Sequence, residues 1–229
     1  MTQDVLLGRL KDMSEPSYAQ FSEKLKVSPR PILGIRVPTL TALAKELVRT
    51  ENKAFLDDFL HYPSVCYEEV ILAYKVFGLL QMDIPTTKHY LEKLLAYNDS
   101  WATNDSLCSS FTAPKKNRAE YWPLIKGYLT SLNPWDIRFA TIAMMSNYLT
   151  DEYTPEVLTL LSAVHSDHYY VNMGLAWTFA TAMAKQREKT LPYLHKGVLK
   201  EEVRKKAIQK CIESFRVTPE DKTLLRSMR

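Results

Sequence analysis

The sequence has few of the features that mark several large classes of protein. Its three cysteines (Cys66, Cys108 and Cys211) lie far apart and form no CxxC spacing. An odd and scattered set of this kind argues against a disulfide framework or a structural zinc site and indicates reduced thiols. The chain has no signal peptide and no run of about 18 apolar residues, so a soluble, cytoplasmic protein without membrane contact is expected.

Several catalytic signatures are also missing. There is no glycine-rich phosphate loop, and no spacing of Ser, His and Asp is typical of a catalytic triad. His165 and His168 lie three residues apart, but no third ligand has a suitable spacing, so no metal site is expected. No lysine lies in register beside Asp105 to act as a Schiff-base nucleophile, which argues against lyase chemistry.

No long stretch alternates with the period of two that is typical of a strand, whereas helix-start signals recur along the chain. In Asn133-Pro134, Thr154-Pro155 and Thr218-Pro219, a capping residue precedes a proline at the first helical position. No linker is long enough to separate two domains. The sequence therefore predicts an all-α chain of about six helix pairs, in a single domain over residues 1–229.

Five segments of the chain align without gaps, and this repeat organises the remaining observations. The segments begin at Tyr67, Trp101, Trp135, Tyr170 and Val203, which are 34, 34, 35 and 33 residues apart. Such regular spacing is typical of a repeat array, in which each helical unit buries its apolar face against its neighbours. We therefore predict a superhelical array of helical repeats with a concave groove.

The alignment separates the residues into two faces. Counting the first residue of a segment as zero, offsets 2, 5, 6 and 9 are mostly small and apolar, as in Leu72, Ala73 and Val76, and are predicted to form the core. Offsets 0, 3, 4 and 7 carry a different set, namely Trp101, Asn104, Asp105, Trp135, Arg138, Tyr170, Trp177, Lys206 and Lys210. Aromatic rings interleaved with cations suit a nucleic-acid strand, although large aromatics at helical spacing are also common in cores.

Positive charge is concentrated at one end of the chain. Residues Lys185 to Arg229 contain 13 Lys or Arg against 6 Asp or Glu, a net charge of +7, and the preceding residues sum to −3. This gradient is compatible with an anionic polymer as the partner, and equally with solvated helix faces. The loop Lys115–Arg118 is interpreted in the same two ways.

The N-terminal region is expected to hold two short helices before the repeats. They cover residues 2–13 and Pro16 to about Val27, with Ser14 placed to cap the second. Ser28-Pro29-Arg30-Pro31 cannot continue a helix, and Gly34 indicates a tight turn between apolar residues before a helix that starts at Pro38. The pair Glu68-Glu69 is predicted to cap the first repeat helix.

Together these motifs resemble the AlkD family of HEAT-like-repeat DNA glycosylases. The resemblance is carried by Ile32-Leu33-Gly34-Ile35-Arg36-Val37-Pro38, Asp99 to Asp105, Trp135 to Ala140, Tyr169 to Trp177 and Lys206 to Lys210. It implies excision from duplex DNA of purines that carry a positive charge after alkylation at a ring nitrogen, such as 3-methyladenine and 7-methylguanine. It also implies that the base stays stacked in the duplex during the reaction, and that no metal or cofactor takes part.

The resemblance assigns a role to each residue of the predicted site. Asp105 would stabilise the oxocarbenium-like sugar and position the attacking water, while Trp101 and Trp177 would flank the sugar and backbone of the lesion. Arg138 would hold a phosphate, and Lys206 and Lys210 would contribute to DNA binding. The chain departs from the family pattern in two places: Pro29 and Pro31 interrupt the segment before Gly34, and Met173 and Gly174 stand where a basic residue would have helped to hold phosphate.

Two other functions stay open at this point. One is a catalytically inactive relative that binds nucleic acid, or another anionic partner, in the same groove, and the other is a helical scaffold for a protein partner. Salt-dependent binding of DNA without base release would select the first, and no affinity for DNA at low salt would favour the second. In each case a monomer is expected.

Overall fold

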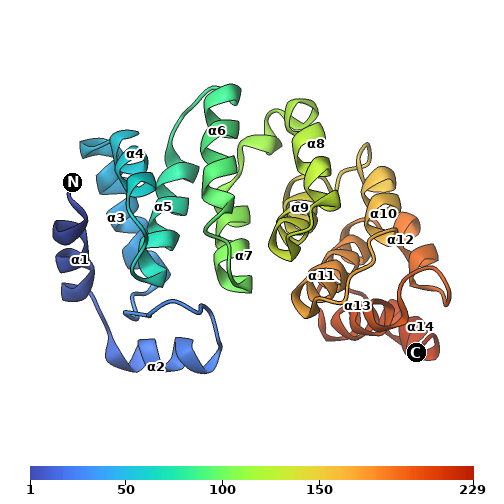
Figure 1. Ribbon diagram of the computed structural model, residues 1–229. Helices are drawn as coiled ribbons and strands as arrows, with labels where there is room; N and C mark the ends of the chain where they lie inside the picture. Colours follow the sequence, from blue (N-terminus) through green and yellow to red (C-terminus); the bar gives the residue numbers. More distant parts are fainter. The chain divides into compact units, whose positions relative to one another are not determined.

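The computed structural model describes residues 1–229 and contains helices but no strand, which confirms the predicted all-α fold (Figure 1). The chain forms two compact units: unit 1 runs from Met1 to Ala113 and unit 2 from Pro114 to Arg229. Within each unit, the most extensive contacts join helices that are two positions apart in the chain, as they do in arrays of helix pairs. No helix is long and apolar enough to span a bilayer. A single domain with one continuous groove stays a prediction.

Unit 1 is organised around a helix that packs between two others. Its helices are α1 (Gln3–Asp12), α2 (Pro16–Lys24), α3 (Val37–Thr50), α4 (Ala54–His61), α5 (Tyr67–Leu79), α6 (Ile84–Leu95) and α7 (Trp101–Ser110). Helix α5 packs against both α3 and α7 (Figure 1). Leu72, Ala73 and Val76 of α5 are buried. The predicted core positions of this repeat are therefore confirmed.

Unit 2 repeats the arrangement around another central helix. Its helices are α8 (Arg118–Gly127), α9 (Pro134–Asn147), α10 (Thr154–Ser162), α11 (Tyr169–Lys185), α12 (Arg187–Thr190), α13 (Glu201–Glu213) and α14 (Pro219–Ser227). Three 3-10 segments complete the chain: η1 (Ala113–Lys115), η2 (Tyr128–Thr130) and η3 (Leu191–Leu194). Helix α11 packs against α9 and α13, and α14 packs against α13.

The repeat helices begin where the sequence predicts. Helices α5 and α7 start at the expected residues, and the other three start one or two residues earlier, at Pro134, Tyr169 and Glu201. Two predicted caps are present, because Asn133 accepts a hydrogen bond from the Trp135 amide (3.0 Å) and Thr218 accepts one from the Asp221 amide (3.2 Å). The periodicity therefore fixed these helix starts to within two residues.

Two predicted helix caps and one predicted helix end, all near prolines, are wrong. Thr154 is the first residue of α10 rather than its cap, since its buried hydroxyl donates to the Thr150 carbonyl (2.6 Å). Glu15, not Ser14, precedes α2. Helix α2 also ends at Lys24, before the expected Val27, because Lys26 has a positive φ of 51° that a right-handed helix cannot contain.

A buried arginine fastens the C-terminal helix to unit 2. Arg204 of α13 is fully buried and pairs with the carboxylate of Glu201 through Nε (2.7 Å) and Nη2 (2.8 Å). Its Nη1 donates to the carbonyl of Met228 (2.8 Å), which follows α14, and to that of Leu194 (3.4 Å). One guanidinium therefore joins three segments, and the oxygen atoms that accept its hydrogen bonds replace the water that burial removes.

We expect the three cysteines to be inert in the folded protein. All three are buried, and burial raises the pKa of the Cys66 and Cys211 thiols to about 12. At pH 8 a thiol with that pKa is ionised in roughly one molecule in 10⁴, and the thiolate is the reactive form. Iodoacetamide at pH 8 should modify the thiols slowly in buffer and all three rapidly in denaturant, as mass spectrometry would show. Fast labelling of Cys66 or Cys211 in buffer would contradict this burial.

Candidate functional site

Helix α7 carries two of the predicted site residues, and a reciprocal cap fixes where it starts. The Ser100 hydroxyl accepts a hydrogen bond from the Thr103 amide (3.1 Å), and the Thr103 hydroxyl accepts one from the Ser100 amide (3.1 Å). A reciprocal cap satisfies amides at the helix end that would otherwise lack partners. It also sets Trp101 at the first helical position and Asp105 one turn later.

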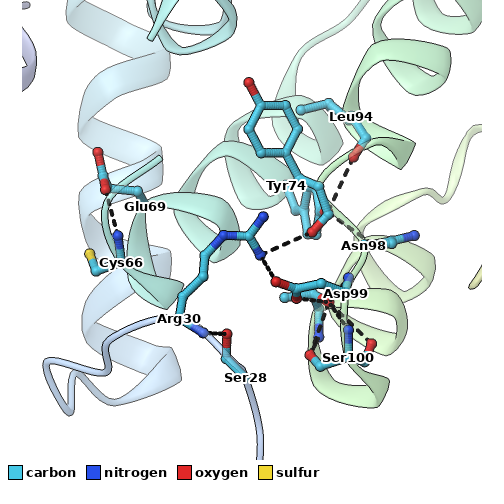
Figure 2. A network of polar contacts seen from close by, with 11 residues as sticks. Ser28, Arg30, Cys66, Glu69, Tyr74, Leu94, Asn98, Asp99 and Ser100 are labelled. Carbon is cyan, nitrogen blue, oxygen red and sulfur yellow. Dashed lines mark hydrogen bonds and ion pairs between the residues drawn. The ribbon is translucent and has the colours of Figure 1, made fainter. Parts of the chain in front are cut away.

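An ion pair holds the loop before α7 against the N-terminal region. Figure 2 shows Arg30 reaching Asp99, with which it forms an ion pair, and Arg30 also donates to the carbonyl of Tyr97 (3.2 Å). Burial raises the pKa of Asp99, and the positive charge of Arg30 partly offsets that effect. The hydroxyl of Tyr74 donates to Asn98 (2.9 Å) from the neighbouring helix α5 (Figure 2). The segment interrupted by two prolines therefore packs against the start of α7.

The Gly34 segment (residues 32–38) binds a buried carboxylate. Glu68 of α5 accepts hydrogen bonds from three consecutive backbone amides, those of Leu33 (3.0 Å), Gly34 (2.8 Å) and Ile35 (3.3 Å). Its neighbour Glu69 caps α5 as predicted, accepting from the amide of Cys66 (2.9 Å). Glu68 thus holds the turn in place. The sequence indicated only a cap, because the contact joins residues more than 30 positions apart.

A cleft in unit 1 lies between α2 and the helices α5 and α7. It has a volume of about 320 Å³, and Trp101 and Asp105 both line it. Three side chains of α2 and its end form the facing wall, namely Tyr18, Phe21 and Leu25. Phe21 and Leu25 are 53% and 48% exposed, so this wall is apolar and open to solvent. The unit 1 cleft therefore combines the Asp105 carboxylate, the Trp101 indole and an uncovered hydrophobic surface.

The cleft also contains a tyrosine that the sequence analysis did not select. Burial and the charge of Glu68 raise the pKa of Tyr67, a hydrogen bond with the Ser106 side chain lowers it, and the charge of Asp105 raises it further. Tyr67 lines the cleft and keeps its proton at neutral pH. It occupies offset zero of its repeat, the position that Trp101 occupies in the next one. The repeat alignment could therefore have identified it.

The predicted cation of α9 lies in a different environment from the one expected. Arg138 is 4% exposed, and its Nη1 donates to the backbone carbonyl of Tyr170 on α11 (2.6 Å). It packs against Gly174, where an added Cβ would lie 3.3 Å from Nη1. Offset 3 of this repeat thus faces the following helix instead of an open surface. Gly174 makes room for the guanidinium, and contact between Arg138 and a phosphate stays a prediction.

A cluster of aromatic rings lies near this arginine in unit 2. Trp135 stacks on Tyr170, with ring centroids 5.6 Å apart, and meets His168 edge to face at 5.2 Å. Burial and the nearby charge of Arg138 lower the pKa of His168. The histidine therefore belongs to an aromatic cluster, and no group of His, Cys, Asp or Glu in the structure could hold a metal ion.

Two predicted site residues meet in a second cavity, within unit 2. Trp177 of α11 is 38% exposed and lines a cavity of about 220 Å³ together with Lys210 of α13. Lys206, one turn earlier on α13, is exposed but does not line this cavity. The structure therefore brings Trp101 together with Asp105 in unit 1, and Trp177 together with Lys210 in unit 2.

Comparison with known proteins gives the family of the chain. No individually curated protein matches the sequence. Residues 6–211 match the family model described as DNA alkylation repair enzyme, and they make up most of the 229-residue chain. The match covers most of both units and every residue of the predicted site. The chain therefore belongs to the family of DNA alkylation repair enzymes.

Proposed function

We propose that the protein is a DNA glycosylase that hydrolyses the N-glycosidic bond of cationic alkylated purines, such as 3-methyladenine and 7-methylguanine, in duplex DNA. The observation that carries this proposal is the placement of Asp105 and Trp101 together in the solvent-open unit 1 cleft. Family membership supports a role in the repair of alkylated DNA. Hydrolysis of the N-glycosidic bond and the role of Asp105 in that reaction go beyond what family membership supports.

The chemistry needs one anion and no acid. Alkylation at a ring nitrogen gives the purine a positive charge, so the base leaves as a neutral molecule and takes the electron pair of the bond to C1′. Positive charge then develops on the deoxyribose, and a carboxylate beside it stabilises this state. Water adds to C1′ and loses a proton to the carboxylate or to solvent, which leaves an abasic site and the free base.

The two carboxylates that line the unit 1 cleft are suited to different roles. Glu68 is buried and accepts three backbone amides, so its negative charge is already stabilised by the Gly34 segment. Asp105 is partly exposed on α7, next to the indole of Trp101. We therefore assign the electrostatic and water-positioning role to Asp105. The indole would exclude bulk water and attract the positively charged sugar.

Contacts with DNA are proposed for unit 2 as well. Lys206 and Lys210 lie on α13, and neither forms an ion pair within the protein. Cations of this kind neutralise phosphates, and binding that depends on them weakens as salt is added. The solvent-accessible ring of Trp177 lies in the same unit and can abut a sugar or base.

Release of 7-methylguanine from a duplex with a single lesion tests the proposed activity. The wild-type chain at low salt should release the base well above the spontaneous rate, without added metal, and the abasic strand should stay intact until it is treated with alkali. Chromatography of the free base and gel analysis of the strand measure the two products. Release at the spontaneous rate would reject the glycosylase, and duplex affinity would then separate an inactive DNA-binding relative from a protein scaffold.

A further inference from the structure

The unit 2 cavity has more polar groups than the two residues selected from the sequence. It lies where α11 passes the C-terminal end of α13 and the turn that follows it. Besides Trp177 and Lys210, its lining includes Thr181, Ser214 and Arg216. The Ser214 hydroxyl accepts the amide of Arg216 (3.2 Å), which fixes the turn that carries the guanidinium.

The hydroxyl of Thr181 is buried in this wall without a partner. Thr181 is 6% exposed, and its Oγ1 has no hydrogen-bond partner in the protein. Other helical threonines of unit 2 donate to the carbonyl four residues before them, as Thr178 does to Gly174 (3.0 Å) and Thr190 to Gln186 (2.8 Å). A buried hydroxyl without a partner is unfavourable, and an oxygen atom of a ligand in this cavity would supply the acceptor that Thr181 lacks.

Positive charge collects around the same cavity without internal compensation. Lys210 and Arg216 line it and form no ion pair. Burial lowers the pKa of the nearby Lys185, and the positive charges of Arg216 and Lys115 lower it further. Glu213 is the only acidic residue in the lining, and its carboxylate accepts a hydrogen bond from the side chain of Gln209. The cations therefore repel one another, and an anion would relieve that repulsion.

We propose that the unit 2 cavity binds a phosphodiester of a DNA strand, with Lys210 and Arg216 neutralising the phosphate and the Thr181 hydroxyl donating to one of its oxygens. The exposed ring of Trp177 lies beside it and contacts the adjoining sugar or base. Thr181 and Arg216 are then DNA-binding residues. This inference rests on the proposed function only in taking DNA as the partner, and it does not require that the protein release a base.

Two substitutions in the full-length chain test the inference through affinity for a short undamaged duplex, measured by fluorescence anisotropy over a series of salt concentrations. Arg216→Ala should weaken binding about tenfold at low salt. It should also reduce the slope of log affinity against log salt by about one, since one phosphate contact is lost. Arg226→Ala is the matched control, because Arg226 is an exposed arginine of α14 outside the cavity.

Thr181→Val separates a ligand-binding role of the hydroxyl from a structural one. Valine has nearly the same shape, so the change should weaken duplex binding about fivefold and leave the salt slope unchanged. The melting temperature of the free protein should not fall, because the hydroxyl has no partner to lose. A lower melting temperature with unchanged affinity would show a structural hydroxyl and overturn the assignment.

The remaining outcomes are equally decisive. Unchanged affinity in both variants would overturn the inference, as would equal losses from Arg216→Ala and Arg226→Ala. Titration with inorganic phosphate distinguishes the source of the anion. If phosphate raised the melting temperature of the wild type but not that of Thr181→Val, and Thr181→Val bound the duplex as tightly as the wild type, the cavity would be a site for free phosphate. That result would reject the DNA contact. A wild-type chain that releases no base but binds DNA through Arg216 would reject only the glycosylase.

Discussion

Asparagine in place of Asp105 should slow the release of 7-methylguanine by about 10²- to 10³-fold, because it keeps the shape of the side chain and removes the negative charge. The charge is needed while positive charge develops on the sugar, so the loss should appear in the rate at saturating enzyme. Affinity for an undamaged duplex should not fall, since a carboxylate does not attract phosphates. Single-turnover kinetics and fluorescence anisotropy measure the two quantities.

A control must separate the local charge from the net charge of the chain. Glu92 is an exposed residue of α6 in the same unit and does not line the cleft. Glu92→Gln makes the same change in net charge, so its rate of release should equal that of the wild type. If Asp105→Asn retained more than about a third of the wild-type rate, the carboxylate would not have the role proposed.

Alanine at Gly34 should destabilise unit 1 by about 3 kcal/mol. Gly34 has a φ of +82°, which costs an L-residue about 1 kcal/mol or more. An added Cβ would lie 2.4 Å from the carbonyl oxygen of Glu15 and 2.5 Å from the amide of Ala19, both of them backbone atoms beside or within α2. Because backbone cannot rotate away, α2 must shift, and that overpacking adds about 1 to 3 kcal/mol. Urea denaturation measures the change.

Gly197 provides a matched control for the backbone angle alone. It has a φ of +85°, and an added Cβ would meet nothing within 4 Å. Gly197→Ala should therefore cost only about 1 kcal/mol, the cost of the left-handed conformation. If the two alanine variants were equally stable, the close approach of α2 to the Gly34 segment would be refuted. Base release should fall in Gly34→Ala alone, since α2 forms one wall of the unit 1 cleft.

The sequence predicted well what depends on local chemistry and on periodicity. The 3.6-residue period and the repeat spacing located the starts of α5 and α7 at the correct residues, because caps and apolar stripes act within one helix. Glycine next to apolar residues indicated the turn at Gly34, and its positive φ confirms it. Membership of the repair family was likewise visible in motifs that lie within single repeats.

Contacts between repeats could not be predicted in the same way. The burial of Arg138 depends on a carbonyl of α11 and on the space above Gly174, which no pattern within α9 records. The binding of three amides by Glu68, and the unsatisfied hydroxyl of Thr181, depend on helices that meet only in the folded chain. The position of a residue in its repeat indicates the face of the helix from which its side chain projects. The neighbouring helices determine whether that side chain is exposed to solvent or buried.

The buried Arg204 has a consequence for where this chain can be divided. The family match ends at residue 211, yet one of the partners of this guanidinium is the carbonyl of Met228, and Val217 and Leu225 are buried as well. Cutting the chain at residue 211 would leave Nη1 of Arg204 without its shorter hydrogen bond, to Met228, and would expose the side chains of α13 that pack against α14. Helix α14 is thus an integral part of unit 2, and any transplant or fusion of these repeats has to include it.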